Sequence, residues 1–270
     1  MRNVEPITGK QYRTIWLSDI HLGYRGCKAE YLLDFLHSTE AETIYLVGDI
    51  IDIWSMKKSM YWPQSHNNII RTLLGKAKRG TRVIFIPGNH DVQIREMAEN
   101  TFGNIEIYEE YVHETSNGKR ILVLHGDVYD SLMQIGPFAS YVGNYGYDFL
   151  MFLNRQIYRL RRMSGLSYWS LASFIKSKVK NAMQHVRKFE EIVARDVAHR
   201  NLDGVVCGHI HHPEMREING ILYCNDGDWV ESCTAMIENQ DGTLELVRWT
   251  EQQTILRSNN VKPFTQPVAA

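Results

Sequence analysis

The sequence predicts an α/β fold, a four-layer sandwich in which two mixed β-sheets pack face to face between outer helices. In the first half, short apolar runs alternate with amphipathic helical segments, which implies parallel strands joined by crossovers. In the last quarter, paired apolar segments flank Asn-Gly or Asp-Gly, a strong signal for antiparallel hairpins. We therefore treat residues 1–270 as one domain carrying an insertion, a size that 270 residues allow.

The first half follows the order strand, helix, strand, helix, strand. Short apolar runs predict strands at residues 12–17, 43–47 and 81–86. Helical patterns lie around residues 31–37 and across residues 66–79. These elements form the expected parallel core of one sheet.

Turn signals organise the remainder of the chain. Hairpins are expected at residues 111–124, 214–224 and 232–249, which makes the C-terminal quarter antiparallel β. Residues 130–200 are expected to be an inserted helical lid subdomain, and residues 252–270, with two prolines, a loose tail.

Composition limits the classes of function. A net charge of −1, with 44% apolar and 23% charged residues, is typical of a soluble globular protein and does not favour general attraction to nucleic acid. No segment approaches the roughly 20 apolar residues of a membrane span, and the first ten residues do not resemble a signal peptide. Four cysteines without CxxC spacing predict reduced thiols in a cytosolic protein, with Cys207 and Cys224 packed in strands.

Polar motifs follow five predicted strands, the last of them the apolar run at residues 204–207, mostly where a strand passes into a loop. Binding sites in α/β sheets gather beyond the carboxyl ends of strands, so we expect these motifs to converge. Residues i and i+2 of an extended segment face the same way, so one strand end can present two ligands. Flanking glycines allow tight turns. The motifs are Asp19-Ile20-His21, Gly48-Asp49, Gly88-Asn89-His90-Asp91, His125-Gly126-Asp127 and Gly208-His209-Ile210-His211.

Carboxylate, imidazole and amide groups together suit Mn, Fe or Zn rather than Ca. The absence of cysteine from the set argues against a structural zinc site. Each motif alone is a weak signal, because DxH or HGD is usually a polar turn. Their combination in five equivalent settings indicates a metal site.

In this order, the motifs DxH, GD, GNHD, HGD and GHxH resemble those of the calcineurin-like metallophosphoesterase superfamily, over residues 14 to about 240. The resemblance implies a metallophosphoesterase sandwich with two divalent ions. We expect Mn²⁺, and Fe and Zn are the alternatives. It implies that His90 contacts the scissile phosphate as general acid. The implied ligands are Asp19, His21 and His211 for one ion, Asn89, His125 and His209 for the other, and Asp49 as the bridge.

Physical chemistry fits those roles. Two cations about 3.5–4 Å apart need an anionic bridge, and such a pair activates water and offsets charge on phosphate. Imidazole titrates in the range that a general acid needs. Asp91 has two interpretations, orienting His90 or making a local turn contact. Asp52 also has two, capping a helix or supporting the ligands.

Residues 154–200 contain eleven Arg or Lys against three Asp or Glu, interleaved with aromatics. One interpretation is a surface helical subdomain with solvated charges. The other is a lid over the metal site that holds an anionic, partly apolar substrate and can rest on an anionic membrane. For a lid, we expect substrate contacts from Arg161, Arg162, Tyr168, Trp169, Lys176 and Lys178.

Within the superfamily, the chain is most similar to the UDP-2,3-diacylglucosamine hydrolases of lipid A synthesis. The similarity lies in residues 18–23 (SDIHLG), 48–54 (GDIIDIW), 160–178 and 208–213 (GHIHHP). It implies a nucleotide-linked glycolipid as substrate, cleaved to UMP and an acylated sugar 1-phosphate. We expect a cytoplasmic protein, and the basic stretch predicts peripheral contact with the inner membrane.

The sequence departs from that group at one position. The best-characterised branch has Arg after the metal-binding Asn, where this chain has His90. A paralogous enzyme acting on another phosphodiester or phosphate ester, nucleic acid included, is therefore the alternative. A non-catalytic scaffold is the weakest hypothesis, because such proteins usually lose ligands. No motif for sequence-specific nucleic-acid reading accompanies the basic stretch.

Overall fold

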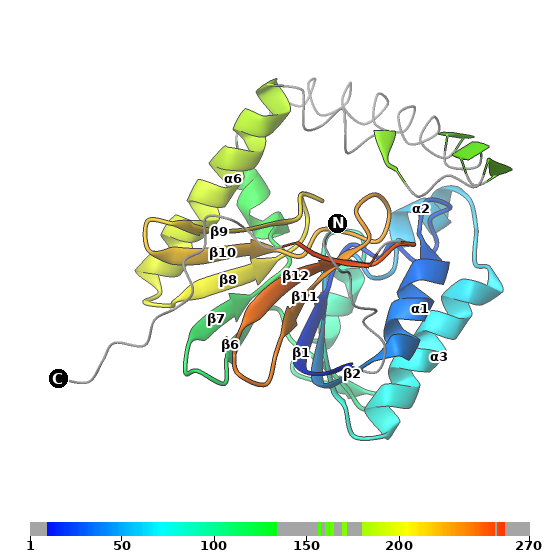
Figure 1. Cartoon of the computed structure of the whole chain (residues 1–270), viewed down its shortest axis with the longest axis horizontal. Helices are drawn as coiled ribbons and strands as arrows, with labels where there is room; N and C mark the ends of the chain where they lie inside the picture. The colour runs from blue at the N-terminus through cyan, green and yellow to red at the C-terminus, as the bar shows by residue number, and fades with distance from the viewer. Residues whose placement is uncertain are drawn as a thin grey trace, which may run out of the picture.

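Two β-sheets pack face to face at the centre of the molecule (Figure 1). The computed structural model describes residues 10–133, 156–157, 160–161, 163–164, 169–171, 180–251 and 253–256. One sheet has eight strands in the order β13-β12-β11-β1-β2-β3-β5-β4, and the other has five in the order β6-β7-β8-β10-β9. Both sheets are mixed, as predicted.

The eight-stranded sheet has a parallel core formed by β1, β2, β3 and β5. Strands β11, β12 and β13 continue it in antiparallel fashion beyond β1, and β4 ends it at the opposite edge. Its strands are β1 (Lys10–Leu17), β2 (Thr39–Val47), β3 (Arg82–Ile86), β4 (Thr101–Phe102), β5 (Ile105–Ile107), β11 (Thr234–Glu238), β12 (Leu244–Arg248) and β13 (Thr254–Leu256).

Helices α1 (Ala29–Ser38) and α3 (Gln64–Lys78) cover the outer face of this sheet (Figure 1). Alternation along β1 explains the layering, because successive side chains of a strand point to opposite faces. Ile15 and Leu17 belong to the core beneath the helices, whereas Trp16 belongs to the core between the sheets.

The five-stranded sheet supplies the other half of the sandwich. Its strands are β6 (Tyr111–Glu114), β7 (Arg120–Val123), β8 (Gly204–Cys207), β9 (Glu214–Ile218) and β10 (Ile221–Asn225). Helix α6 (Lys180–His199) covers its outer face with Phe189, Val193 and Val197. The four layers are therefore helices, sheet, sheet and helix, as predicted.

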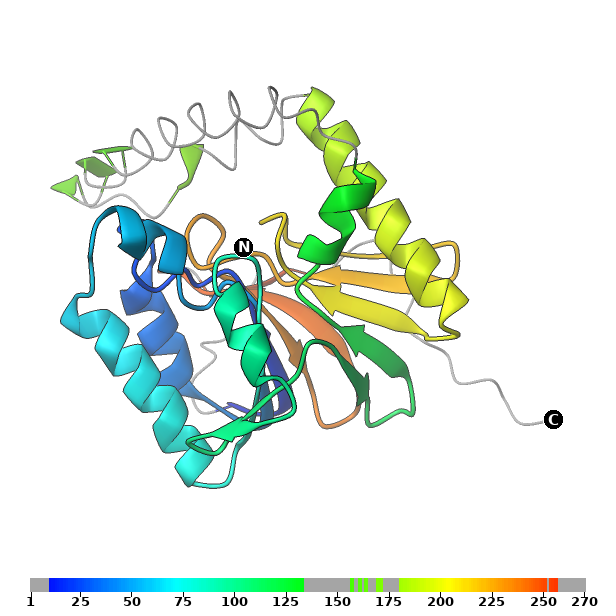
Figure 2. The same cartoon turned by 180° about the vertical axis from the view of Figure 1, so that it is seen from behind.

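Three short helical segments lie in loops at the candidate site. They are α2 (Ile53–Lys58), η1 (Val92–Met97) and η2 (Asp127–Leu132). Seen from behind, η2 lies beside α6 (Figure 2). Asp52 caps α2, because its Oδ1 accepts a hydrogen bond of 2.7 Å from the amide of Ser55.

The structure corrects three expectations about chain organisation. The tail was expected to be loose from residue 252, but β13 pairs with β12 over three residues, and residues 257–270 lie outside the described part. The end of the expected 130–200 lid is α6, whose apolar side packs on the sandwich. The last quarter is not purely antiparallel, because β10 pairs in parallel with β8. That pairing joins strands distant in sequence, so no local turn signal reveals it.

Cys207 and Cys224 are free, buried thiols in β8 and β10, as predicted. Among the residues that the structure describes, no helix combines the length and apolar character needed to cross a membrane.

Candidate metal centre

The five polar motifs meet at one end of the two sheets. Backbone hydrogen bonds join their loops, from the Asp19 amide to the Gly48 carbonyl at 3.0 Å and from the Gly208 amide to the His125 carbonyl at 3.1 Å. Motifs from both sheets thus contribute to one region, as the sequence predicted.

Asp19, His21 and His211 form the first cluster of candidate ligands. One donor atom from each lies within 4.8 Å of the others. Nε2 of His211 is 3.0 Å from Oδ1 of Asp19 and 3.3 Å from Nε2 of His21. Asp19 and His21 are buried. Three donor atoms therefore point at a common position.

The second predicted set is only partly assembled around His125, because His209 belongs to none of the groups of donor atoms within 4.8 Å of one another in the described residues. Its Nε2 lies 3.3 Å from Oδ1 of Asn89, while its Nδ1 lies 3.0 Å from the carbonyl of Val47. The ring of His209 lies edge-on to that of His125, with 5.1 Å between centroids. The His209 amide also donates to Oδ2 of Asp19 at 2.9 Å, which ties the two sets together.

Asp49 lies between the sets. Its Oδ2 is 3.8 Å from Nε2 of His21, and its Oδ1 is 3.5 Å from Nε2 of His125. Its side chain is buried, so water does not screen these contacts strongly. One carboxylate therefore faces an imidazole of each set.

Strained backbone is concentrated at these loops. Five candidate ligands adopt positive φ angles between 49° and 70°, a region that costs non-glycine residues roughly 1–3 kcal/mol each. The five are Asp19, His21, Asp49, His209 and His211. Backbone strain shared by candidate ligands indicates that the fold holds these side chains for a function.

Two glycines allow the loops to approach so closely. A Cβ atom on Gly88 would lie 2.3 Å from Oδ1 of Asp49, and one on Gly208 would lie 2.3 Å from Oδ2 of Asp19. Any larger residue at either position would displace a candidate ligand.

The cluster couples buried acids to buried imidazoles. Burial alone would raise the pKa of Asp19, but His211 and His21 hold it well below its usual range. Burial alone would lower the pKa of His125, but the charge of Asp49 raises it to about 10. The carboxylates thus create a strongly negative environment that attracts a proton or a metal cation.

His90 is held beside the first cluster by Asp52. Nδ1 of His90 lies 2.9 Å from Oδ1 of Asp52, whose Oδ2 lies 3.2 Å from Nδ1 of His21. The ring of His90 is edge-on to His21 at 4.7 Å and packs beside Trp54 at 4.4 Å between centroids. Both interpretations of Asp52 hold, since the same carboxylate also caps α2.

Of the two interpretations of Asp91, the structure shows the local turn contact, and the hydrogen bonds of this carboxylate go to backbone amides. Its Oδ2 accepts hydrogen bonds from the amides of Ile50 and Ile51, and its Oδ1 accepts one of 2.6 Å from the amide of Gly88. Asp91 therefore fastens two motif loops together. Although Asp91 is next to His90 in sequence, its carboxylate is directed at the backbone of those loops and not at the imidazole of His90.

The predicted substrate contacts are described only in part. The guanidinium of Arg161 lies 5.9 Å from the ring centroid of the half-exposed Trp169. The other four predicted residues, Arg162, Tyr168, Lys176 and Lys178, lie outside the described residues.

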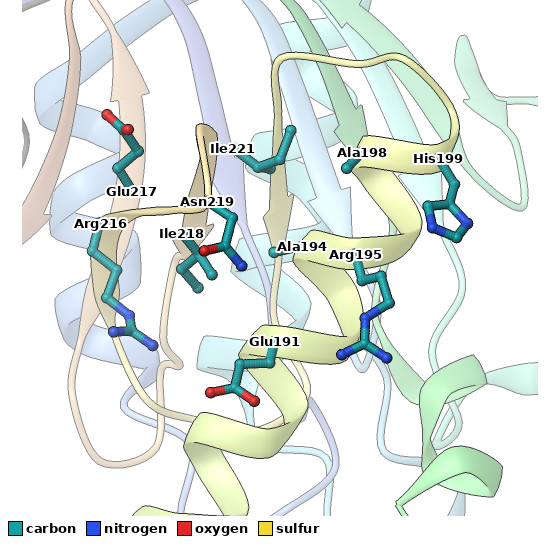
Figure 3. Close-up of a pocket in the computed structure, with 10 residues that line it drawn as sticks. All are labelled: Glu191, Ala194, Arg195, Ala198, His199, Arg216, Glu217, Ile218, Asn219 and Ile221. Carbon is teal, nitrogen blue, oxygen red and sulfur yellow. The ribbon is translucent and has the colours of Figure 1, made fainter.

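A pocket of about 440 Å³ lies elsewhere, between α6 and the β9–β10 hairpin (Figure 3). Glu191, Arg195 and Arg216 are among its lining residues. It contains none of the predicted ligands, so we place the chemistry at the strand ends and not in this cavity.

Donor chemistry and orientation fit divalent ions at the cluster. Oδ1 of buried Asp19 accepts no hydrogen bond within the described chain, although an imidazole nitrogen lies 3.0 Å away. Nδ1 of His21 and Nδ1 of His125 each have an outer acceptor, which directs both Nε2 atoms inward. A buried carboxylate oxygen that accepts no hydrogen bond and lies near imidazole nitrogens is suited to bind a cation.

Sequence reasoning missed two further residues. Nε2 of His209 lies 2.8 Å from Oδ1 of Asp130 on η2. Arg95 on η1 contacts both carboxylate oxygens of Asp127, at 2.8 and 2.6 Å, and the carbonyl of Pro87, so it joins two motif loops. No spacing rule flags either residue, because both contacts depend on how loops fold back.

The fold and the clustered ligands define a metal-dependent phosphoesterase. The sequence matches the calcineurin-like phosphoesterase family over residues 12–213, and the chain belongs to that family. The divalent-metal chemistry of the family agrees with the ligand groups found at the strand ends.

Curated relatives and a solved structure align with most of the chain. The UDP-2,3-diacylglucosamine hydrolase of Blochmanniella pennsylvanica is 26% identical over 76% of this chain and 81% of its own length. That of Neisseria gonorrhoeae is 24% identical over 79% of this chain and 88% of its own. The phosphoesterase Yfce from E. coli aligns with a TM-score of 0.47 and 14% identity, over 90% of this chain and 96% of that one.

Proposed function

We propose that the chain hydrolyses phosphate esters or diphosphates at a centre of two divalent ions, Mn²⁺ first. Asp19, His21 and His211 would hold one ion, Asn89, His125 and His209 the other, with Asp49 between them. The position of Asp49 carries the proposal, because its two oxygens face imidazoles of both sets. When bound, such a pair activates water and offsets the charge of the phosphate oxygens.

The chain's own residues would then manage the leaving group. His90 lies at the edge of the first cluster, where its Nε2 is 3.8 Å from Oδ2 of Asp49. Asp52 accepts from the other ring nitrogen of His90, so Nε2 is the atom that would deliver a proton. Trp54 packs against the same ring and limits its rotation.

For the substrate, we propose a UDP-2,3-diacylglucosamine-like diphosphate. The bond between the α-phosphorus and the bridging oxygen would break, and water oxygen would bond to that phosphorus. UMP would leave on one side, and the acylated sugar 1-phosphate would leave with the bridging oxygen and a proton from His90. The names of the two relatives support this substrate. The basic residues of 154–200 suit its charge.

UMP release from UDP-2,3-diacylglucosamine with Mn²⁺ tests the proposal directly. We expect turnover by the wild type and a loss of about 10²–10⁴-fold in His90→Ala. His37→Ala, on the exposed end of α1, is the matched control and should retain turnover. Intact UDP-acylsugar in the presence of wild-type, Mn-loaded protein would rule this substrate out.

A phosphoesterase with another substrate is the second candidate. The presence of His90 favours it, because the best-characterised branch of the resembling hydrolases has Arg there. A panel of phosphodiesters, simple phosphate esters and single- and double-stranded DNA separates the candidates. Cleavage of one of these substrates without UMP release would support the metal-dependent hydrolysis and show that the substrate is not the UDP-linked lipid.

The location that accompanies the lipid proposal is the cytoplasm, with peripheral contact to the inner membrane. The basic residues of 154–200 support it, since each contributes on the order of 1 kcal/mol at an anionic surface. Sedimentation with vesicles containing anionic lipid tests the contact. Protein that stays in the supernatant at low salt would contradict it.

A further inference from the structure

The segment η2 brings a carboxylate against one of the predicted ligands. Oδ1 of Asp130 lies 2.8 Å from Nε2 of His209. The side chain of Asp130 is 54% exposed and that of His209 is 15% exposed, so the contact lies on the outer side of the imidazole. Nδ1 is then the His209 nitrogen left for the centre.

The position of Asp130 is fixed by contacts of η2 with α6. The Tyr129 hydroxyl donates to Oδ2 of Asp196 at 2.7 Å. The Tyr129 ring packs edge-on to Phe189, with 6.2 Å between centroids, and Phe189 lies 6.0 Å from the ring of His209. Helix α6 therefore supports both the imidazole and the segment that carries its carboxylate.

Two other predicted ligands have the same arrangement. Nδ1 of His21 contacts Asp52, and Nδ1 of His125 contacts the carbonyl of Val47. In both, the nitrogen that faces away from the centre has an acceptor, which fixes the tautomer and directs the other nitrogen inward. His209 differs because its outer nitrogen is Nε2.

We propose that Asp130 is a positioning residue that holds His209 with its proton on Nε2 and so presents Nδ1 to the second ion. The inference rests on the proposed two-ion function and adds a residue to that site. His209 would be the one Nδ1 ligand beside His21 and His125, which present Nε2. Loss of Asp130 should weaken the ion held by Asn89, His125 and His209 and spare the one held by Asp19, His21 and His211.

Titration of the metal-free protein with Mn²⁺ by calorimetry measures the two sites separately. We expect two ions in the wild type, and in Asp130→Ala a 10- to 100-fold weaker Kd for one of them. Asp130→Asn keeps an acceptor of the same size, so its Kd for that ion should lie between those of the wild type and Asp130→Ala. Ser131→Ala, the next residue of η2, is the matched control and should bind as the wild type does.

Imidazole nitrogen NMR of the zinc-loaded protein gives a second readout. The wild type should show His209 with hydrogen on Nε2, and Asp130→Ala should show broadening or a second form at that ring alone. Wild-type Kd values for both ions in Asp130→Ala, or equal weakening of both, would overturn the inference. A wild type that binds fewer than two ions would instead contradict the proposed function, so the two failures are distinguishable.

Discussion

Oδ1 of Asp52 accepts a hydrogen bond from Nδ1 of His90, with 2.9 Å between the two atoms. Its other oxygen contacts His21, so a single carboxylate positions both a predicted metal ligand and the predicted proton donor. Burial alone would raise the pKa of Asp52, but the contacts with His21 and His90 hold it well below its usual range. Asp52 is therefore an anion throughout the neutral range.

Asp52→Asn separates this electrostatic role from the helix cap. Asn caps helices about as well as Asp, so α2 should remain, while the charge that holds the two imidazoles is lost. We expect kcat to fall about 10- to 100-fold with little change in Tm. Steady-state kinetics with a thermal melt check both. A loss of Tm equal to that of Asp52→Ala would show that the variant acts through α2.

His90 should matter most for poor leaving groups. A p-nitrophenolate leaves without a proton, whereas an alkoxide needs one, so His90→Ala should slow an alkyl phosphodiester far more than a p-nitrophenyl ester. The ratio of the two kcat values in variant and wild type measures this difference. An equal loss on both substrates would contradict the role of general acid.

Metal removal should abolish turnover and leave the sandwich folded, because the three apolar clusters do not depend on the centre.

Metal binding must displace protons from the imidazoles, and the pKa of His125 is raised to about 10 by Asp49. Mn²⁺ affinity should therefore increase as pH rises. Calorimetric titrations at pH 6, 7 and 8 test the sign. An affinity that is constant or falls with pH would contradict it.

His66 should make stability depend on pH. It is buried on α3, accepts a hydrogen bond of 3.0 Å from the Gly23 amide, and burial lowers its pKa to about 4. In the unfolded chain the pKa of His66 is about 6.5, so His66 is protonated there at a higher pH than in the folded protein. The free energy of unfolding is therefore highest above pH 6.5 and decreases as the pH falls toward 4. The loss should reach about 3 kcal/mol at most.

Denaturant unfolding between pH 7 and 4 measures this term. His66→Asn keeps an acceptor near Nδ1 but does not titrate, so its stability should fall less steeply than that of the wild type. Parallel curves for the two proteins would show that His66 contributes nothing to the pH dependence.

Gly208→Ala should damage the centre through sterics. The added Cβ would meet Oδ2 of Asp19 and Oγ of Ser18 at 2.3 Å. Overpacking of this kind costs about 1–3 kcal/mol, and displacement of Asp19 should weaken metal binding. Gly75→Ala in α3 is the control, because its nearest contact is a flexible Arg79 nitrogen at 3.3 Å. A wild-type Tm and Mn²⁺ affinity in Gly208→Ala would contradict the clash.

The fold and the ligand motifs could be predicted from sequence because their signals are local. The short apolar runs, the Asn-Gly turns and the polar residues after each strand are all patterns within a few consecutive residues. Strand ends converge by the general geometry of α/β sheets, so the meeting of Asp19, Asp49, His125 and His209 followed as well.

Only the tertiary structure decided which side chains support the ligands. Asp91 is adjacent to His90 yet binds the backbone at Gly88 and Ile50, whereas Asp52 and Asp130 reach imidazoles 31 to 79 positions away. The parallel pairing of β8 with β10 and the return of β13 to β12 are likewise long-range. Such contacts depend on side-chain direction and loop path, which no local spacing encodes.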